Sequence, residues 1–404
     1  MKNVEKLEKN ECLLWFGGWT SKFGNIIFDY ANSISIACAF TGNPKILAIY
    51  QSSESIIQII FNLIGGAKAD KGSRKKIAIV TDVLAAIICF VLSFFVASGF
   101  MAEVMIIANA LLALVHAFNS PTYKSLIREM IKKDRIGFYN AVGNAGGEII
   151  SVAGPVVGVW LVGIIGVRGA LLFDAGTFLV SALAESMLNK LDGEEKKAES
   201  GKRSNVFLDI KDGFAYLLRE KKILFLLILA SLVNFFLAGY NLLLPYTEVM
   251  FDGLLPHFYS KALAAGAIGG IAGSVILAKF SKKLGNSEVP MIFFLMCTGL
   301  ALILVPVVAL LGIPALCLIP FVLFEAALTA FNIRFMSYVQ VSVDENYLGR
   351  VFSIIFTVAV LFMPVGSFAF SMILNVAKIS SFLVVGIGIA VLSAGSFVIN
   401  ARMK

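Results

Sequence analysis

The chain has 404 residues, of which 58% are hydrophobic and only 15% are charged, and its mean hydropathy is +0.87. A composition this apolar excludes a soluble globular protein. The net charge of +8 does not indicate a nucleic-acid-binding protein, because the cations stand in short segments between long apolar runs and not on a basic soluble domain.

The apolar runs are long enough to cross a membrane as helices, which takes roughly 20 residues each, and they lack the alternation of β-barrel strands. The first six expected spans lie near residues 13–40, 45–64, 77–98, 101–127, 138–165 and 168–188. The second six lie near residues 223–249, 259–280, 289–311, 314–339, 351–375 and 380–400. We therefore expect an all-α polytopic membrane protein with twelve transmembrane helices in two six-helix halves.

The longest polar stretch of the chain separates the two sets of spans. We expect an N-terminal half at residues 1–190, a cytosolic linker at 191–222 and a C-terminal half at 223–404. After Ser204, the apolar residues of 206–218 fall on one helical face, which predicts an amphipathic helix along the inner membrane surface. This helix either tethers the two halves or serves as a regulatory docking site.

Lysine and arginine are concentrated in alternate connecting segments. With the N-terminus inside the cell, only Lys45, Arg168, Lys261 and Lys378 face outward. The positive-inside rule then predicts that both termini lie in the cytosol, and we expect a multi-pass protein of the plasma membrane. The mixed charges of the first eleven residues lead into the first span without a small-residue cleavage site, so we expect no removable signal peptide.

Residue patterns that would indicate catalysis or metal binding are absent from the sequence. The two histidines, His116 and His257, have neither ligand nor triad spacing, and the five cysteines form no CxxC motif. We expect no enzyme, no cofactor and no metal site. A non-transporting membrane sensor or scaffold is an alternative of another class, although such a protein would be expected to carry an extra soluble domain.

Polar residues inside apolar spans are costly, and they tend to face cavities or neighbouring helices. One face of the first span carries Lys22, Asn25, Asp29 and Asn32. Three later spans each carry a polar pair seven residues apart, which returns to nearly the same face after two turns: Asn109 and His116, Asn234 and Asn241, and Glu325 and Asn332. The first helix of every group of three therefore carries a polar stripe, as expected of an alternating-access transporter with a central site.

Hydrogen bonding between helices would explain each stripe without any ligand. Two further polar stripes lie on spans that are not the first of a group of three. They count against the interpretation that the stripes mark a threefold grouping around a central site. The second span carries Gln51, Glu54, Gln58 and Asn62, and the sixth carries Asp174, Thr177, Ser181 and Glu185. The stripes alone therefore leave a substrate cavity and static helix packing both open.

Three carboxyl groups near the middle of their spans, Glu325, Asp29 and Glu148, are candidates for proton coupling. Arg334, two residues after Asn332, could pair with a carboxylate or face the inner mouth of a cavity. Lys22 and Asp29 are also seven residues apart, so a structural ion pair is the alternative to a functional role for both.

Small residues indicate which spans pack closely. Gly266, Gly269, Gly270 and Gly273 form two overlapping GxxxG patterns in the eighth span, and Gly154 and Gly158 belong to a glycine-rich face of the fifth. Pro155 frees a backbone carbonyl and permits a bend. Close packing would let two halves rock against each other, and it would equally suit a static interface.

The stretch from Gly65 to Lys76 is a charged segment between two long apolar runs. Its pattern Gly66-x-x-x-Asp70-Lys71-x-x-Arg74-Lys75 resembles motif A of the major facilitator superfamily, in the place where that family has it. Gly154-Pro155-Val156-Val157-Gly158 is similar to the core of motif C, a feature of exporters in that family. Ser73, in place of a glycine, and the segments Asp174–Ala182 and Leu348–Ser353 resemble the macrolide-efflux and enterobactin-exporter branch.

This resemblance implies a twelve-helix exporter that exchanges its substrate for protons by alternating access. In the family, the motif A carboxylate, matched by Asp70, clasps the eleventh helix and controls the inner gate, with Lys71 and Arg74 as its basic partners. Many drug exporters of the family have an arginine within the fourth span, and this chain has none there.

The resemblance implies a small amphipathic substrate, such as a macrolide-like drug or antibiotic. Mid-membrane acids favour a cationic compound, whereas Lys22, His116 and Arg334 would equally suit an anionic siderophore or lysolipid, and a peptide natural product is a further alternative. The expected partners are this substrate, protons and the lipid bilayer, with no nucleic acid, and we expect the protein to be a monomer.

Overall fold

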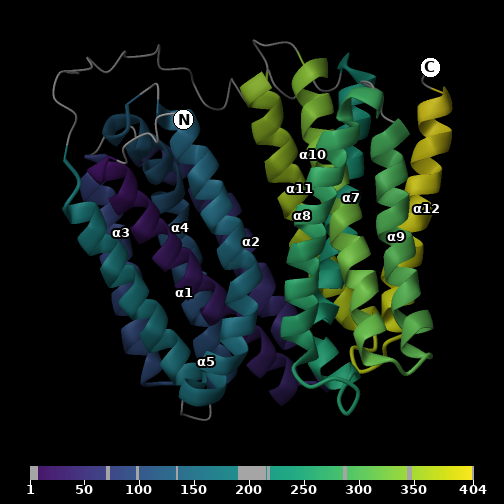
Figure 1. Cartoon of the computed structure of the whole chain (residues 1–404), viewed down its shortest axis with the longest axis horizontal. Helices are drawn as coiled ribbons and strands as arrows, with labels where there is room; N and C mark the ends of the chain where they lie inside the picture. Colours follow the sequence, from purple (N-terminus) through teal and green to yellow (C-terminus); the bar gives the residue numbers. More distant parts are fainter. Residues whose placement is uncertain are drawn as a thin grey trace, which may run out of the picture. The chain divides into compact units, whose positions relative to one another are not determined.

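The computed structural model describes residues 8–69, 73–96, 100–132, 135–189, 215, 219–284, 289–343 and 348–402, and all their regular elements are helices. The first helices are α1 (Lys9–Ala39), α2 (Lys45–Ala69), α3 (Arg74–Ser93), α4 (Met101–Met130) and α5 (Ile136–Ser186) (Figure 1). They are followed by α7 (Lys221–Met250), α8 (Phe258–Leu284), α9 (Val289–Ala309), the 3₁₀ helix η2 (Pro314–Leu318), α10 (Ile319–Ser342), α11 (Leu348–Ile373) and α12 (Ser381–Arg402). The expected all-α class is confirmed.

The longest helix, α5, contains two of the expected spans. At Gly166 the backbone leaves the helical region, with φ 63° and ψ −175°. This region is open to glycine and strained for any residue with a Cβ, so the chain reverses there without a separate loop. Counted as two segments, α5 brings the described α-helices, without the short 3₁₀ helix η2, to the expected twelve.

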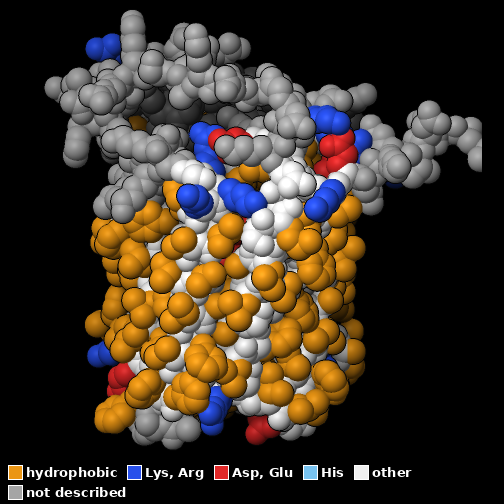
Figure 2. Space-filling view, turned by 90° about the vertical axis from the view of Figure 1, so that its left-hand side faces the viewer, with side chains coloured by type: hydrophobic (Ala, Val, Ile, Leu, Met, Phe, Trp, Pro, Cys, Tyr) orange, Lys and Arg blue, Asp and Glu red, His pale blue; other side chains and the backbone are white. Residues whose placement is uncertain are grey.

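The surface of the described helices is that of a membrane protein. Eight of them are long and apolar enough to cross a membrane, and α11 contains a shorter apolar segment, Thr357–Ile373. Figure 2 shows a broad band of hydrophobic side chains around the middle of one face, with most of the charged side chains in view near one end. α1 and α2 are not among the eight, because polar residues interrupt their apolar sequence.

The contacts between residues divide the chain into two compact units. The first consists of residues 1–36 and 53–197, and the second of residues 37–52 and 198–404. The segment that joins α1 to α2 therefore belongs to the second unit. Within each unit the helices run side by side, up and down (Figure 1).

In the first unit, α1 packs closely against both segments of α5. A Cβ on Gly154 would lie only 2.6 Å from Cγ2 of Ile26, and a Cβ on Gly24 would lie 2.1 Å from Oγ1 of Thr177. No larger residue fits at either glycine without displacing its neighbour. Gly158, in the same segment of α5 as Gly154, faces the ring of Tyr30, so the glycine-rich face expected in the fifth span is an α1-binding face.

In the second unit, the expected GxxxG face of α8 packs against α10. A Cβ on Gly269 would lie 2.2 Å from the carbonyl oxygen of Val322, and one on Gly273 would lie 2.3 Å from that of Ala326. The two backbones approach so closely that only hydrogen fits between them. α7 packs against α11, and α9 packs against both α10 and α12.

Two expected connecting segments require comment. α2 continues to Ala69, so the first five residues of the charged stretch that begins at Gly65 are helical and not part of a loop. The amphipathic helix expected at 206–218 lies, apart from residue 215, outside the described residues.

Candidate functional site

The first unit contains a cavity of about 380 Å³ between α1, α2 and α4. Its lining consists of Lys22, Asn25, Ile26, Phe28, Asp29, Glu54, Gln58, Asn109, Leu112, Ala113 and His116. Seven of these eleven side chains are polar or charged, and the other four are apolar. A concave site with apolar walls and a few convergent polar groups is the usual form of a small-molecule site.

The contribution of α1 follows from its helical period. Lys22, Asn25 and Asp29 are spaced three and four residues apart, which places them on one face of the helix. Nζ of Lys22 donates a hydrogen bond to the carbonyl oxygen of Gly147 on α5, at 2.7 Å. The ammonium group is thereby held beside α5, and a close approach of the α5 backbone is possible because residue 147 has no side chain.

The contribution of α2 is a second carboxylate. Glu54 lines the cavity one turn before Gln58, whose Nε2 donates a hydrogen bond to Oε1 of Glu54 at 2.9 Å. Glu54 and Asp29 face the same cavity and interact electrostatically. Because both groups carry negative charge when ionised, a cation bound between them would interact favourably with each.

The contribution of α4 is the pair that the sequence predicted. Asn109 and His116 both line the cavity, two helical turns apart. Nδ2 of Asn109 donates to Oγ of Ser53 on α2 at 3.3 Å, and the imidazole of His116 lies beside the ring of Phe178 on α5, with 6.0 Å between the ring centroids. Leu112 and Ala113, between these two residues, complete the apolar wall.

Two other candidates of the first unit lie elsewhere. Asn32 is buried, with 1% of its surface exposed, and it is not among the residues that line the cavity. Glu148 is exposed on α5 and is likewise absent from the lining. The structure thus brings together Lys22, Asn25, Asp29, Asn109 and His116 and leaves these two apart.

The candidates of the second unit are more dispersed. Glu325 on α10 packs against α8, where a Cβ on Gly266 would lie 2.9 Å from its Cγ. Asn234 donates to the carbonyl oxygen of Ala230 in its own helix, at 2.9 Å. Asn332 is exposed and Arg334 is buried.

Asn241, the second residue of the α7 stripe, takes part in a contact with α2. Its backbone carbonyl accepts a hydrogen bond from Nε2 of Gln51 at 2.9 Å. This contact lies within the second unit, because residues 37–52 belong to it. It uses the backbone of Asn241, so it assigns no role to the side chain.

The motif A residues lie at the connection between α2 and α3. Gly66 is within α2, and Asp70 and Lys71 lie outside the described residues. Arg74, at the start of α3, forms an ion pair with Glu129 near the end of α4. Nζ of Lys75 donates to the carbonyl oxygens of Ser186 and Leu188, both at 2.7 Å, and so caps the C-terminal end of α5.

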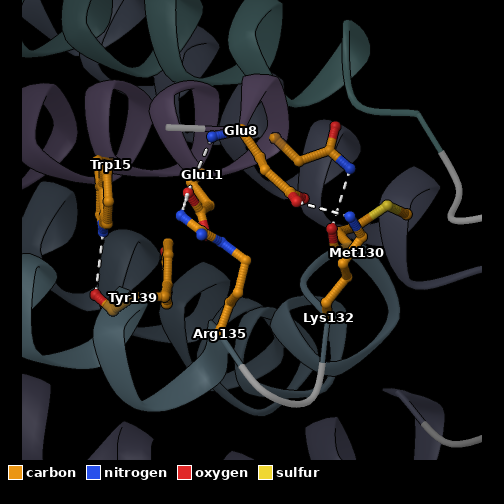
Figure 3. A network of polar contacts seen from close by, with 8 residues as sticks. Glu8, Glu11, Trp15, Met130, Lys132, Arg135 and Tyr139 are labelled. Atoms are coloured by element: carbon orange, nitrogen blue, oxygen red, sulfur yellow. Dashed lines mark hydrogen bonds and ion pairs between the residues drawn. The ribbon is translucent and has the colours of Figure 1, made fainter. Parts of the chain in front are cut away.

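A polar network holds the start of α1 against the connection between α4 and α5 (Figure 3). Arg135 donates to both carboxylate oxygens of Glu11, at 2.5 and 2.7 Å, and Nε1 of Trp15 donates to the carbonyl oxygen of Tyr139 at 3.1 Å. Glu11 precedes the first expected span, and the hydrogen bonds from Arg135 lower its pKa below the ordinary value of 4.5. The network fixes the orientation of α1 and therefore of its polar stripe.

Sequence reasoning did not assign a site role to Glu54 and Gln58. Their polar stripe was visible in the sequence. It lies on the second helix of a group of three, however, and it therefore counts as evidence against a central site built from the first helix of each group. The available signal was the spacing of four residues between two polar groups in an apolar span. Among the described residues, no three histidine, cysteine or acidic side chains lie close enough together to hold a metal ion.

Comparisons with known proteins identify a related sequence and several solved structures with a similar fold. The chain is 26% identical over 284 residues to the uncharacterized MFS-type transporter YkuC of Bacillus subtilis (strain 168), a match that covers 68% of this chain and 65% of the relative, just under two thirds of its length. The crystal structure of the nucleoside transporter NupG is similar, with a TM-score of 0.76, 15% identity, and 96% of this chain and 98% of that chain covered.

A bacterial homologue of the iron transporter ferroportin, in its inward-facing state, is also similar, with a TM-score of 0.70, 14% identity, and 96% of this chain and 100% of that chain covered. At these identities the solved structures establish the fold alone. A family model matches residues 14–367. The chain is therefore a multi-pass membrane protein that belongs to the Major Facilitator Superfamily.

Proposed function

We propose that this transporter exports a cationic amphipathic small molecule, such as a macrolide-like drug, across the plasma membrane in exchange for protons. In this proposal both termini are cytosolic, the protein works as a monomer, and transport proceeds by alternating access. The observation that carries the proposal is the cavity of the first unit, which combines the carboxylates of Asp29 and Glu54 with apolar walls.

The charge of the cavity supports a cationic substrate. Of the three charged side chains in its lining, two are acidic, and the ammonium of the third, Lys22, is hydrogen-bonded to Gly147. A positively charged group of the substrate would bind between Asp29 and Glu54, and its apolar body would lie against residues such as Phe28 and Leu112.

The same two acids supply a route to proton exchange. In the empty cavity, repulsion between Asp29 and Glu54 favours a proton on one of them. A cationic substrate replaces this proton, because it neutralises the same charge. Substrate and proton then bind in competition, which is the condition for exchange in opposite directions. Glu325 and Glu148 are the other coupling candidates.

Inner-gate control by motif A is part of the proposal. Gly66, Asp70, Lys71 and Arg74 match the motif residue by residue, and the ion pair of Arg74 with Glu129 ties the beginning of α3 to the end of α4. Together with the motif C-like Gly154, Pro155 and Gly158, these residues support the resemblance to exporters of the major facilitator superfamily, whereas the resemblance to the macrolide-efflux and enterobactin-exporter branch rests on Ser73 and the segments Asp174–Ala182 and Leu348–Ser353.

A second candidate substrate is an anionic siderophore, a peptide natural product or a lysolipid. The observation that favours it is that Lys22 and His116 line the same cavity as the acids. An anionic group would bind Lys22 in place of the Gly147 carbonyl. The two candidates make opposite predictions for substitutions of the cavity acids.

The test is a substrate screen in everted vesicles, with a pH-sensitive dye that reports proton release. The panel contains a macrolide, a cationic lipophilic dye, a siderophore and a lysolipid. The variants are Asp29→Asn and Glu54→Gln, and the matched control is Glu103→Gln, an exposed acid in the first turn of α4.

We expect a response to cationic compounds that both cavity variants lose and the control retains. A response to anionic compounds that survives in both cavity variants would support the second candidate instead. No response to any compound, with the protein present in the membrane, would overturn the exporter proposal and favour a non-transporting role.

A further inference from the structure

A second group of acids lies in the first unit, outside the cavity. Asp82 on α3 and Glu185 at the end of α5 are each only 3% exposed, and they interact electrostatically with each other. Neither residue lines the cavity. We refer to Asp82 and Glu185 as the buried acid pair.

The two members of the pair have unequal hydrogen bonding. Nδ2 of Asn119 on α4 donates to Oδ1 of Asp82 at 2.7 Å, and the Ser181 hydroxyl, one turn before Glu185, also interacts with Asp82. Both carboxylate oxygens of Glu185 are buried and make no hydrogen bond with any part of the chain that the structure describes. Described donors thus stabilise a negative charge on Asp82, whereas no described donor does so for Glu185.

No described cation neutralises the pair. Nζ of Lys75, two helical turns before Asp82 on α3, is bonded to the carbonyl oxygens of Ser186 and Leu188, and Lys76 is exposed. Tyr123 of α4 lies near both acids, but its hydroxyl donates to the carbonyl oxygen of Leu14, at 2.8 Å. α1 packs over Ser181 with Gly17, a residue that has no side chain. Two buried carboxylates without a counter-charge cannot both remain ionised at low cost.

The buried acid pair lies at one end of a row of buried polar residues on α5, which we call the polar file. Glu185, Ser181, Thr177 and Asp174 are spaced four, four and three residues apart on one face of α5, and each is at most 5% exposed. At 1.5 Å per residue this file extends about 16 Å from the end of α5 toward the middle of the helix. Oγ1 of Thr177 lies 3.2 Å from Oδ1 of Asp174, and the thiol of Cys89 lies 3.7 Å from Oδ2.

We propose that Asp82 and Glu185 form a proton-binding site that holds a single exchangeable proton, carried by Glu185. The site is separate from the substrate cavity and opens onto the polar file of α5. This inference rests on the proposed exchange for protons and extends it, because it adds a site at which a proton can be stored away from the substrate.

The test is infrared difference spectroscopy of the purified full chain in lipid nanodiscs, over a pH series and without substrate. The carbonyl stretch of a protonated carboxylic acid is followed. We expect a band in the wild type that disappears as the pH rises, that is lost in Glu185→Gln, and that persists in the control Glu103→Gln. A titrating band that survives unchanged in Glu185→Gln would overturn the proposal.

A second variant keeps the test decisive if Glu185→Gln fails to fold. Asp82→Asn removes the neighbouring negative charge, so the Glu185 band should titrate at a pH lower by at least about one unit. An unshifted midpoint would overturn the pairing. In a third measurement, sodium chloride is added to the wild type at fixed pH, with choline chloride as the control salt. Loss of the band with sodium but not with choline would overturn the proposal, because it would show a site for an inorganic cation and not for a proton.

The spectroscopic result does not depend on the transported compound. A vesicle screen without any response, together with a titrating Glu185 band, would reject the proposed export function and retain the proton site. A vesicle response together with a missing Glu185 band would retain the proposed export function and reject the proton site.

Discussion

Arg135 donates two hydrogen bonds to the carboxylate of Glu11, whose side chain is completely buried. The two residues are 124 positions apart in the chain, so this contact connects the beginning of α1 to the beginning of α5. Because α1 supplies Lys22, Asn25 and Asp29 to the cavity, the same contact fixes the position of nearly half of the polar lining.

The Glu11–Arg135 pair predicts a pH-dependent stability. The pKa of Glu11 is lowered in the folded protein, so its contribution is complete above the ordinary value of 4.5 and is lost as the pH falls through the lower folded value. Glu11→Gln leaves Arg135 without its partner and should reduce the free energy of unfolding by about 3 kcal/mol at neutral pH. Denaturant unfolding across a pH series should show this difference shrinking below about pH 4.

The control for this prediction is Glu8→Gln. Glu8 pairs with Lys132, but both side chains are partly exposed, so the loss should be at most about 1 kcal/mol. A Glu11→Gln deficit that stays constant at all pH values would contradict the assignment of the effect to the ionised carboxylate.

The break inside α5 predicts a requirement for glycine at position 166. Gly166→Ala places a Cβ at φ 63° and ψ −175°, which should cost about 1–3 kcal/mol. Gly163→Ala is the matched control, because no atom lies within 4 Å of its added Cβ and the position is helical. Thermal unfolding of both variants provides the measurement, and equal melting temperatures would mean that the backbone at residue 166 is not strained by a side chain.

The contact between α1 and α5 predicts a steric penalty at Gly154. An added Cβ would meet Ile26 at 2.6 Å, so Gly154→Ala should lose about 1–3 kcal/mol of stability. Gly176→Ala, in the second segment of the same helix, adds its methyl group to open space and should be neutral or slightly stabilising. The same unfolding assay compares them. If Gly154→Ala is as stable as Gly176→Ala, α1 does not pack on this face of α5.

The cavity predicts a role for Glu54 equal to that of Asp29. Glu54→Gln should reduce the rate of substrate-dependent proton release in everted vesicles about tenfold or more, which corresponds to about 1.4 kcal/mol. Gln58→Ala removes only a hydrogen bond to Glu54 and should have a smaller effect, of about threefold. Wild-type rates in Glu54→Gln, with an inactive Asp29→Asn, would remove Glu54 from the site.

Much of the fold could be predicted from the sequence, because the signals are local. Hydropathy over roughly 20 residues reports whether a segment can lie in lipid, and the described helices begin and end close to the expected spans. The α1 stripe and the α4 pair were also readable from helical spacing alone, and five of those residues line one cavity. The expected break between the fifth and sixth spans, at residues 166–167, falls at a single glycine, because one residue with positive φ suffices to reverse the direction of the chain.

The sequence by itself therefore determined that the chain forms apolar helices and on which face of each helix the polar residues lie. Only the tertiary structure decided which of these faces meet. Glu54 and Gln58 join the cavity because α2 packs beside α1 and α4, while Asp82 and Glu185 pair because α3 packs beside the end of α5. The physical reason is that helical periodicity is set by neighbouring residues, whereas contacts between helices depend on close packing at positions such as Gly24 and Gly154, whose partners are distant in the sequence.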